Sequence, residues 1–178
     1  MRTLHIVTLC TGNAARSVMA GVMLEQLAEM EGLGLTITTA GTHVLEGQPL
    51  GMRTKEAMVS IGELDTSGVG RHRSHQLDDA DCAAADLIVA MEADHVRYVR
   101  RRHPDAAHKT ATLHRLVATL PVTEAPFADR LAALELAEVD LSGDVDVIDP
   151  AGGEQEHYDA VAAEIFELCG VLLTVVGD

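Results

Sequence analysis

The chain has 178 residues, of which 47% are hydrophobic and 23% charged, and its formal net charge is −15 at pH 7. This length and composition predict one folded domain, residues 1–178, rather than a disordered chain. The negative charge argues against nucleic-acid binding, which needs a basic surface. The apolar stretches are too short to span a bilayer, and the first residues lack a signal-peptide layout. We therefore expect a cytoplasmic protein with no membrane partner.

Strand and helix patterns alternate along the chain. A β-branched apolar run predicts a strand over 4–9, and apolar residues at helical spacing predict a helix over 16–31, which Gly32 and Gly34 end. The further predicted elements, in chain order, are a strand over 35–39, a helix over 51–61, a strand over 86–90, a helix over 92–102, a strand over 110–113 and a helix over 155–175. Such alternation predicts a parallel sheet with helices on both faces.

Residues 121–146 have the least regular pattern. The segment is rich in acidic residues, a piece over 128–138 has helix-forming composition, and Ser142-Gly143-Asp144 is typical of a turn. We interpret it as an acidic surface excursion. A basic cluster precedes it, formed by Arg97, Arg100, Arg101 and Arg102. The cluster is interpreted as a solvated helix face, and a docking patch for an acidic partner is the alternative.

The three cysteines, Cys10, Cys82 and Cys169, are odd in number and lie far apart in the sequence. This usage is typical of a reducing compartment and argues against a disulfide framework. Neither the cysteines nor the histidines show metal-ligand spacing, so the sequence predicts no metal and no cofactor.

The most informative segment is Cys10-Thr11-Gly12-Asn13-Ala14-Ala15-Arg16-Ser17, between the first predicted strand and the first predicted helix. A short loop that enters a helix points unpaired backbone N–H groups at one spot, where the helix dipole favours an anion. Gly12 and Asn13 tolerate the unusual backbone angles that such a loop needs. Arg16 can grip two phosphate oxygens with its planar fork.

The same donors would stabilise a thiolate on Cys10, and a hydroxyl at Ser17 could hydrogen-bond the sulfur when it acts as a leaving group. The octet therefore predicts a nucleophilic cysteine that attacks phosphate esters. The plain alternative is a buried cysteine at the end of a strand, because free cysteine is often buried. The surrounding strand, loop and helix favour catalysis.

The octet and its flanks resemble the active-site loop of low-molecular-weight protein-tyrosine phosphatases. Four further segments are similar to motifs of this family in the same order: residues 39–42 (Thr-Ala-Gly-Thr), 72–77 (His-Arg-Ser-His-Gln-Leu), 86–91 (Asp-Leu-Ile-Val-Ala-Met) and 147–150 (Val-Ile-Asp-Pro). The resemblance implies a three-layer α/β/α, flavodoxin-like fold with a four-stranded parallel sheet in the order 2-1-3-4. It also implies a hydrolase that removes phosphate from phosphotyrosine in proteins through a phosphocysteine intermediate.

The resemblance assigns roles to particular residues. Cys10 and Arg16 are catalytic, and phosphate or another oxyanion is bound by the rest of the loop: Thr11, Gly12, Asn13, Ala14, Ala15 and Ser17. Thr39 and His72 are expected to hydrogen-bond Asn13 and hold the loop in shape.

Asp149 is the candidate general acid, since the leaving oxygen must be protonated, and it would act as a base towards water in the second step. Pro150 biases Asp149 to an extended backbone, which would help to aim its carboxyl group. Asp146 is the alternative acid. An ordinary Asp-Pro turn is the interpretation without catalysis.

The chain departs from the family pattern after Pro150. An aromatic residue usually follows there, whereas this chain has Ala151-Gly152-Gly153, and Tyr158 is the nearest possible substitute. Position 14, Ala14, is also small. A protein arginine phosphatase therefore stays open. An arsenate reductase is a further alternative, although it would need two more cysteines after the third strand. The remaining alternative is a phosphate- or phosphopeptide-binding module without catalysis.

Overall fold

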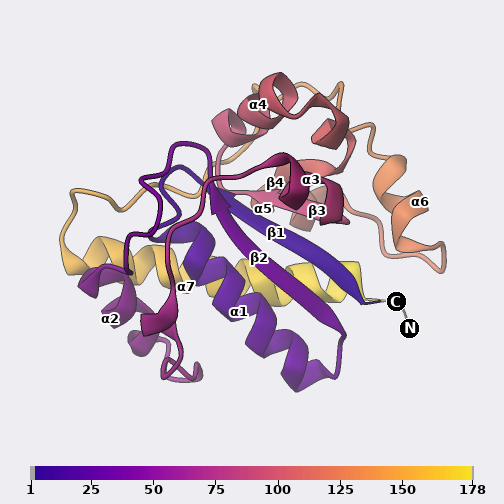
Figure 1. Ribbon diagram of the computed structural model, residues 1–178. Helices are drawn as coiled ribbons and strands as arrows, with labels where there is room; N and C mark the ends of the chain where they lie inside the picture. The colour runs from indigo at the N-terminus through magenta and orange to yellow at the C-terminus, as the bar shows by residue number, and fades with distance from the viewer. Residues whose placement is uncertain (1–2, 178) are drawn as a thin grey trace.

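A computed structural model describes residues 3–177 as a four-stranded sheet between two layers of helices (Figure 1). The strands are β1 (Leu4–Cys10), β2 (Leu35–Gly41), β3 (Leu87–Ala90) and β4 (Thr110–Thr112). They are hydrogen-bonded in the order β2-β1-β3-β4, and each neighbouring pair is parallel. The predicted α/β/α fold and strand order are confirmed.

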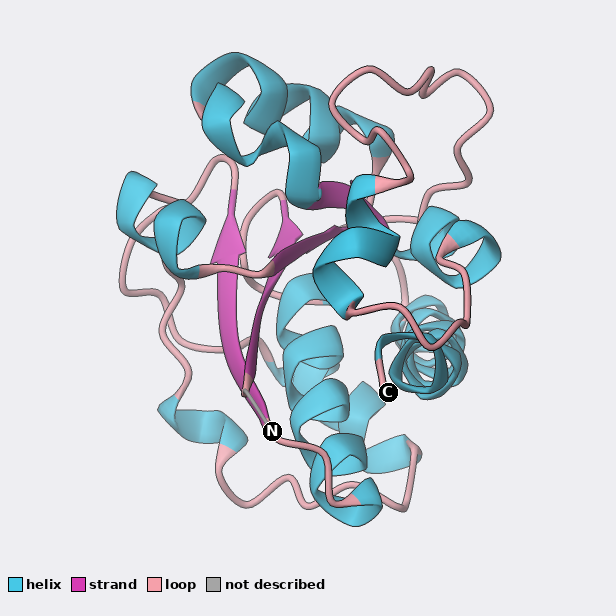
Figure 2. Cartoon of the chain, turned by 90° about the vertical axis from the view of Figure 1, so that its right-hand side faces the viewer, coloured by secondary structure: helices cyan, strands magenta, loops and turns pink. Residues whose placement is uncertain are grey.

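Seven α-helices occur among the described residues: α1 (Arg16–Glu31), α2 (Met52–Ser60), α3 (Asp79–Ala84), α4 (Ala93–Arg102), α5 (Leu113–Thr119), α6 (Phe127–Ala132) and α7 (Gln155–Val176). Short 3₁₀ helices, η1 (Val69–Arg71) and η2 (Pro104–Lys109), join them. Seen along the edge of the sheet, helices lie on both of its sides (Figure 2). Over the part of the chain that is described, no helix is long and apolar enough to cross a bilayer.

The central strands alternate between two buried faces. Ile6 of β1 joins the core formed with α1, α5 and α7, whereas Val7 joins a smaller core that includes residues of α3 and α4. Both side chains are fully buried. A strand that is covered on both faces reads as a continuous apolar run, which explains why β1 could be recognised from the sequence.

Two short helices were missed in the prediction. The strand predicted over 110–113 ends at Thr112, whose hydroxyl accepts a hydrogen bond from the backbone N–H of Arg115 and caps α5. In α3, Asp78 and Asp81 form a capping box. Helices of six or seven residues are too short to show helical periodicity, so their caps were the available signals.

The acidic segment over 121–146 is more firmly attached than a surface excursion. The helix expected over 128–138 is limited to α6, and Leu136 beyond it is buried. Arg100 Nη2 donates hydrogen bonds to the backbone oxygens of Leu136 (2.7 Å) and Val139 (2.9 Å). The interpretation of Arg100 as part of a solvated face was therefore wrong, because backbone carbonyls of this segment use its guanidinium.

Candidate active site

Cys10 is the last residue of β1, and α1 begins six residues later at Arg16. The arrowheads of β1 and β2 point to the same end of the sheet, where loops gather (Figure 1). The backbone N–H of Thr42 donates to Cys10 O, and that of His43 donates to Thr11 O, both at 2.9 Å. The loop is therefore anchored at its start by the segment that follows β2. This is the edge at which open α/β sheets bind ligands.

Asn13 holds the middle of the loop. Its φ is 51°, in the left-handed region, and the residue is fully buried. Its side-chain N–H₂ donates to Ser17 Oγ (2.9 Å) and Thr39 Oγ1 (3.0 Å), and its Oδ1 accepts from the N–H of His75 (2.9 Å). Asparagine tolerates this backbone, and its amide supplies both donors and an acceptor.

The cysteine sulfur lies 3.0 Å from Ser17 Oγ. Because Ser17 Oγ already accepts a hydrogen bond from Asn13, its own proton is available for the sulfur. An O–H donor stabilises a thiolate more than a thiol. The three residues Cys10, Asn13 and Ser17 thus form a buried chain of donors that ends at the sulfur.

A glycine outside the octet accommodates the loop. A Cβ on Gly41, at the end of β2, would lie 2.6 Å from Thr11 O and 2.9 Å from Asn13 N. A Cβ on Gly12 would meet nothing within 4 Å, and Gly12 does not have a positive φ. The left-handed conformation belongs to Asn13, and the close backbone approach that requires glycine is at Gly41.

Arg16, the first residue of α1, is 1% exposed and has three partners. Its Nη1 donates to Val147 O at 2.7 Å and pairs with Glu92, and its Nη2 lies 3.3 Å from Asp149 Oδ2. Glu92, which directly precedes α4, was not identified as a site residue in the sequence analysis. The guanidinium is thus held by two segments, the residue before α4 and the stretch 147–149, which fixes the direction of its planar fork.

Asp149 and Asp146 have different environments. The side chain of Asp149 is 46% exposed, and its Oδ1 accepts from the N–H of Ala151 at 3.0 Å. Asp146 instead accepts from the N–H of Ala93 at 2.8 Å, at the first residue of α4. Of these two aspartates, the one beside Arg16 is therefore Asp149, whereas Asp146 accepts a hydrogen bond from the N-terminus of α4.

The two residues expected to support Asn13 both contact it. Thr39 Oγ1 accepts from its side chain, and His72 Nε2 donates to its backbone oxygen at 2.8 Å. Burial lowers the pKa of His72, while the hydrogen bond to Asn13 opposes this shift. A neutral His72 retains this contact as long as its proton is on Nε2.

The loop residues Ala14 and Ala15 carry little side-chain chemistry. Thr54 of α2 donates its hydroxyl to Ala14 O at 3.0 Å, which attaches this part of the loop to α2. Tyr158, the possible substitute for an aromatic wall, packs against the main hydrophobic core. Phe127 and Phe166 belong to the same core, whereas Tyr98 contacts His43 and His103.

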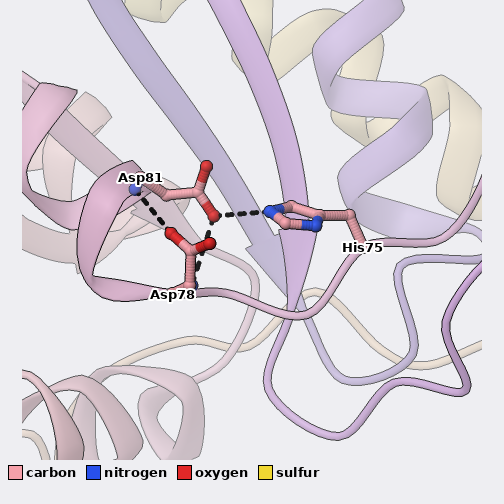
Figure 3. Close-up of side chains that lie close together, drawn as sticks. All are labelled: His75, Asp78 and Asp81. Atoms are coloured by element: carbon pink, nitrogen blue, oxygen red, sulfur yellow. Dashed lines mark hydrogen bonds and ion pairs between the residues drawn. The ribbon is translucent and has the colours of Figure 1, made fainter.

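His75, Asp78 and Asp81 bring potential metal-ligand atoms within 4.8 Å of one another (Figure 3). Their sequence spacing was not recognised as ligand-like. His75 Nε2 lies 2.7 Å from Asp81 Oδ2, and Asp78 and Asp81 accept from each other's backbone N–H groups. These contacts are a hydrogen bond and a helix capping box, which give each of the three side chains a partner within the protein.

His95 of α4 is a buried residue near the loop that the sequence analysis did not single out. Its Nδ1 accepts from the N–H of Glu92 at 3.1 Å, and its Nε2 lies 2.9 Å from Thr11 Oγ1. Burial is the main cause that lowers the pKa of His95 to about 4, and Arg16 contributes. No motif pointed to it, because its partner Thr11 lies 84 residues away in sequence.

The pKa of His95 predicts acid sensitivity. An unfolded chain takes up a proton on this residue near pH 6.5, whereas the folded protein, with a pKa of about 4, does not. Stability contributed by the neutral ring is therefore present above pH 6.5 and lost between pH 6.5 and 4, by about 3 kcal/mol at most. Urea unfolding at pH 7 and pH 4.5 measures this loss. The loss should be smaller in His95→Gln, and an equal loss in both proteins would contradict the prediction.

Comparison with known proteins agrees with this geometry. The family profile described as low molecular weight phosphotyrosine protein phosphatase matches residues 5–129. A protein-arginine-phosphatase of Bacillus subtilis is 27% identical to this chain over 165 residues. The alignment covers 93% of this chain and 91% of the relative's length. A probable low molecular weight protein-tyrosine-phosphatase, EpsP, of Ralstonia solanacearum is 34% identical over 111 residues, covering 62% of this chain and 69% of its own.

Among solved structures, a low molecular weight protein tyrosine phosphatase from T. tengcongensis superimposes with a TM-score of 0.77 at 25% identity, covering 96% of this chain and 98% of that one. The fold and the loop together define a phosphatase class in which the cysteine-bearing loop follows the first strand of a parallel sheet. The chain belongs to the low molecular weight phosphotyrosine protein phosphatase family. The matched residues include the loop and His72 but end before Asp149.

Proposed function

We propose that the protein is a cysteine-dependent protein phosphatase that works through a phosphocysteine intermediate. The observation that carries the proposal is the position of Cys10 Sγ, 3.0 Å from Ser17 Oγ, in a loop with the buried Arg16. The carboxylate of Asp149 lies beside the guanidinium of the same arginine. A nucleophile, an anion-binding fork and a carboxyl group that can exchange protons with solvent are the parts that phosphate-ester hydrolysis needs.

In the first step, Cys10 Sγ attacks phosphorus as a thiolate, and the bond from phosphorus to the leaving oxygen breaks. Asp149, in its protonated form, gives its proton to that oxygen. Arg16 and the N–H groups of the loop hold the other phosphate oxygens.

In the second step, the Asp149 carboxylate takes a proton from water, and the water oxygen attacks phosphorus. The S–P bond breaks, phosphate leaves, and the Ser17 hydroxyl stabilises the thiolate that is restored. No cofactor takes part in either step.

The proposed substrates are phosphorylated proteins in the cytoplasm, with phosphotyrosine as the first candidate side chain. The family profile is described as a phosphotyrosine protein phosphatase, and the relative from Ralstonia is named a probable protein-tyrosine-phosphatase. Phosphoarginine is the second candidate, because the aromatic residue expected after Pro150 is missing. Residues 151–153 are Ala-Gly-Gly, and the possible substitute, Tyr158, packs against the core. The pair of carboxylates at Arg16, Glu92 and Asp149, would also suit a substrate with a cationic guanidinium.

Rates on matched peptides that differ in phosphotyrosine or phosphoarginine test the choice between substrates. A kcat/KM at least about tenfold higher for phosphotyrosine supports the first candidate. The reverse ratio supports the second. Hydrolysis of neither peptide, with no turnover of para-nitrophenyl phosphate between pH 5 and 7, would contradict the phosphatase itself and favour a binding module.

Replacement of Asp149 by asparagine tests the general acid. The asparagine amide is not an acid that can give up the proton, so a substrate with a poor leaving group, such as phenyl phosphate, should lose about 10²-fold or more in kcat/KM. Para-nitrophenyl phosphate, whose leaving group is a weak base, should lose less. Asp146→Asn is the matched control, because Asp146 contacts the N–H of Ala93. Equal losses on both substrates would remove Asp149 from this role.

The properties of the cysteine thiols do not support assignment of the protein as an arsenate reductase. All three cysteines are free, and Cys82 and Cys169 are buried. Burial raises the pKa of Cys82 to about 11 and that of Cys169 still further above its usual range. A thiol has to ionise in order to relay a disulfide, and neither residue is suited to this.

A further inference from the structure

We propose that His95 is a positioning residue of the phosphate-binding loop: its neutral imidazole donates a hydrogen bond to the Thr11 hydroxyl and fixes the loop residue next to Cys10. The inference rests on the proposed function of the loop. It assigns a role to a residue in α4, on a different element from the octet.

The tautomer of His95 follows from its two partners. Nδ1 faces the backbone N–H of Glu92 at 3.1 Å, and because an N–H group can only donate, Nδ1 must accept. The ring proton is then on Nε2, which lies 2.9 Å from Thr11 Oγ1. The ring therefore donates and Thr11 Oγ1 accepts. Since His95 is 3% exposed, water cannot readily replace either contact.

The start of the loop depends on two attachments at Thr11. The backbone oxygen of Thr11 accepts from the N–H of His43, and its hydroxyl is held by His95. Beyond it, Asn13 is held by its own partners. Without His95, Thr11 would keep its backbone contact alone, and the side chain would be free to change rotamer beside the nucleophile.

The junction between β3 and α4 connects the loop with the segment that carries Asp149. Met91 O accepts from the N–H of Val147 at 2.8 Å, and Glu92 pairs with Arg16. His95 stands one turn further along and contacts Thr11. The junction between β3 and α4 therefore positions the nucleophile loop, the arginine and the proton donor relative to one another. Catalysis depends on such accurate positioning of the reacting groups.

Two substitutions separate the two contacts of His95. In His95→Asn, the side-chain oxygen can take the place of Nδ1 and accept from Glu92, but the side chain is too short to reach Thr11. In His95→Gln, the terminal N–H₂ can take the place of Nε2 and donate to Thr11, while the contact to Glu92 is lost. The pair thus distinguishes helix capping from loop positioning.

We expect His95→Asn to melt near the wild-type temperature but to lose roughly tenfold in kcat/KM on para-nitrophenyl phosphate, as the loss of one buried hydrogen bond predicts. His95→Gln should stay within about twofold in kcat/KM and melt at a lower temperature. Thr11→Val should match His95→Asn, and the double variant should be no worse than either single one, because both remove the same contact.

Inorganic phosphate gives a readout that does not depend on turnover. Phosphate should protect Cys10 of the wild type from alkylation by iodoacetate, measured by mass spectrometry of the Cys10 peptide, and a roughly tenfold higher concentration should be needed in His95→Asn. Failure of the phosphatase proposal appears as absent turnover of the wild type. Failure of the His95 proposal appears as unchanged phosphate protection.

Wild-type kcat/KM in His95→Asn, equal losses in the asparagine and glutamine variants, or additive losses with Thr11→Val would each overturn the role of His95. Should His95→Asn not fold cooperatively, Thr11→Val alone decides. Thr11 is exposed, and its substitution leaves the contact of His95 Nδ1 with the N–H of Glu92 in place, so that only the hydrogen bond of His95 Nε2 is removed. Wild-type activity and wild-type phosphate protection in Thr11→Val would then overturn the proposal.

Discussion

Replacement of Cys10 by serine is expected to lower kcat on para-nitrophenyl phosphate by at least about 10³-fold. A serine hydroxyl is a much weaker acid than a thiol and stays protonated, and the group beside residue 10, the hydroxyl of Ser17, is a donor that does not take up its proton. Steady-state kinetics between pH 5 and 7 measures the loss. Binding of inorganic phosphate should persist, since Arg16 and the loop backbone remain.

Cys82→Ala is the matched control for this substitution. Cys82 lies in α3, is buried like Cys10, and belongs to the smaller core on the other face of the sheet. Its replacement should leave kcat unchanged, because its side chain packs in that smaller core. Appreciable turnover by Cys10→Ser, or a comparable loss in Cys82→Ala, would contradict the assignment of Cys10 as the nucleophile.

Replacement of Arg16 by lysine is expected to lower kcat/KM by about 10²-fold or more, although the charge is kept. Lysine presents a point charge in place of a planar fork, and one ammonium cannot reach Val147 O, Glu92 and Asp149 as the guanidinium does. The loss should also appear as weaker inhibition by inorganic phosphate, since ground-state binding uses the same fork.

Arg101→Lys is the control for Arg16→Lys, since Arg101 is an exposed arginine of α4. We expect it to leave kcat/KM and phosphate inhibition unchanged. Circular dichroism and a melting curve of Arg16→Lys are needed beside the kinetics, because Glu92 would lose part of its pairing. A folded Arg16→Lys variant with more than about a third of wild-type kcat/KM would contradict the role of the fork.

Much of the fold was predictable because its signals are local. The apolar runs of β1 and β3 and the glycines after α1 lie within single segments, so the alternation of strand and helix could be read directly. Segment 121–146 was less predictable. Its attachment depends on Arg100, which reaches backbone oxygens distant in sequence, and no local pattern records such contacts.

By itself, the amino-acid sequence determined which residues share the loop of the proposed chemistry, since Cys10, Asn13, Arg16 and Ser17 lie within eight residues of one strand-to-helix connection. The tertiary structure decided what surrounds that chemistry: the close approach of Gly41, the pairing of Arg16 with Glu92, the buried ring of His95, and the choice of Asp149 over Asp146 beside the arginine. The physical reason is that parallel strands bring their carboxyl ends together only when the sheet is assembled. Residues 76 to 84 positions apart then share one buried site, and their contacts cannot be inferred from spacing.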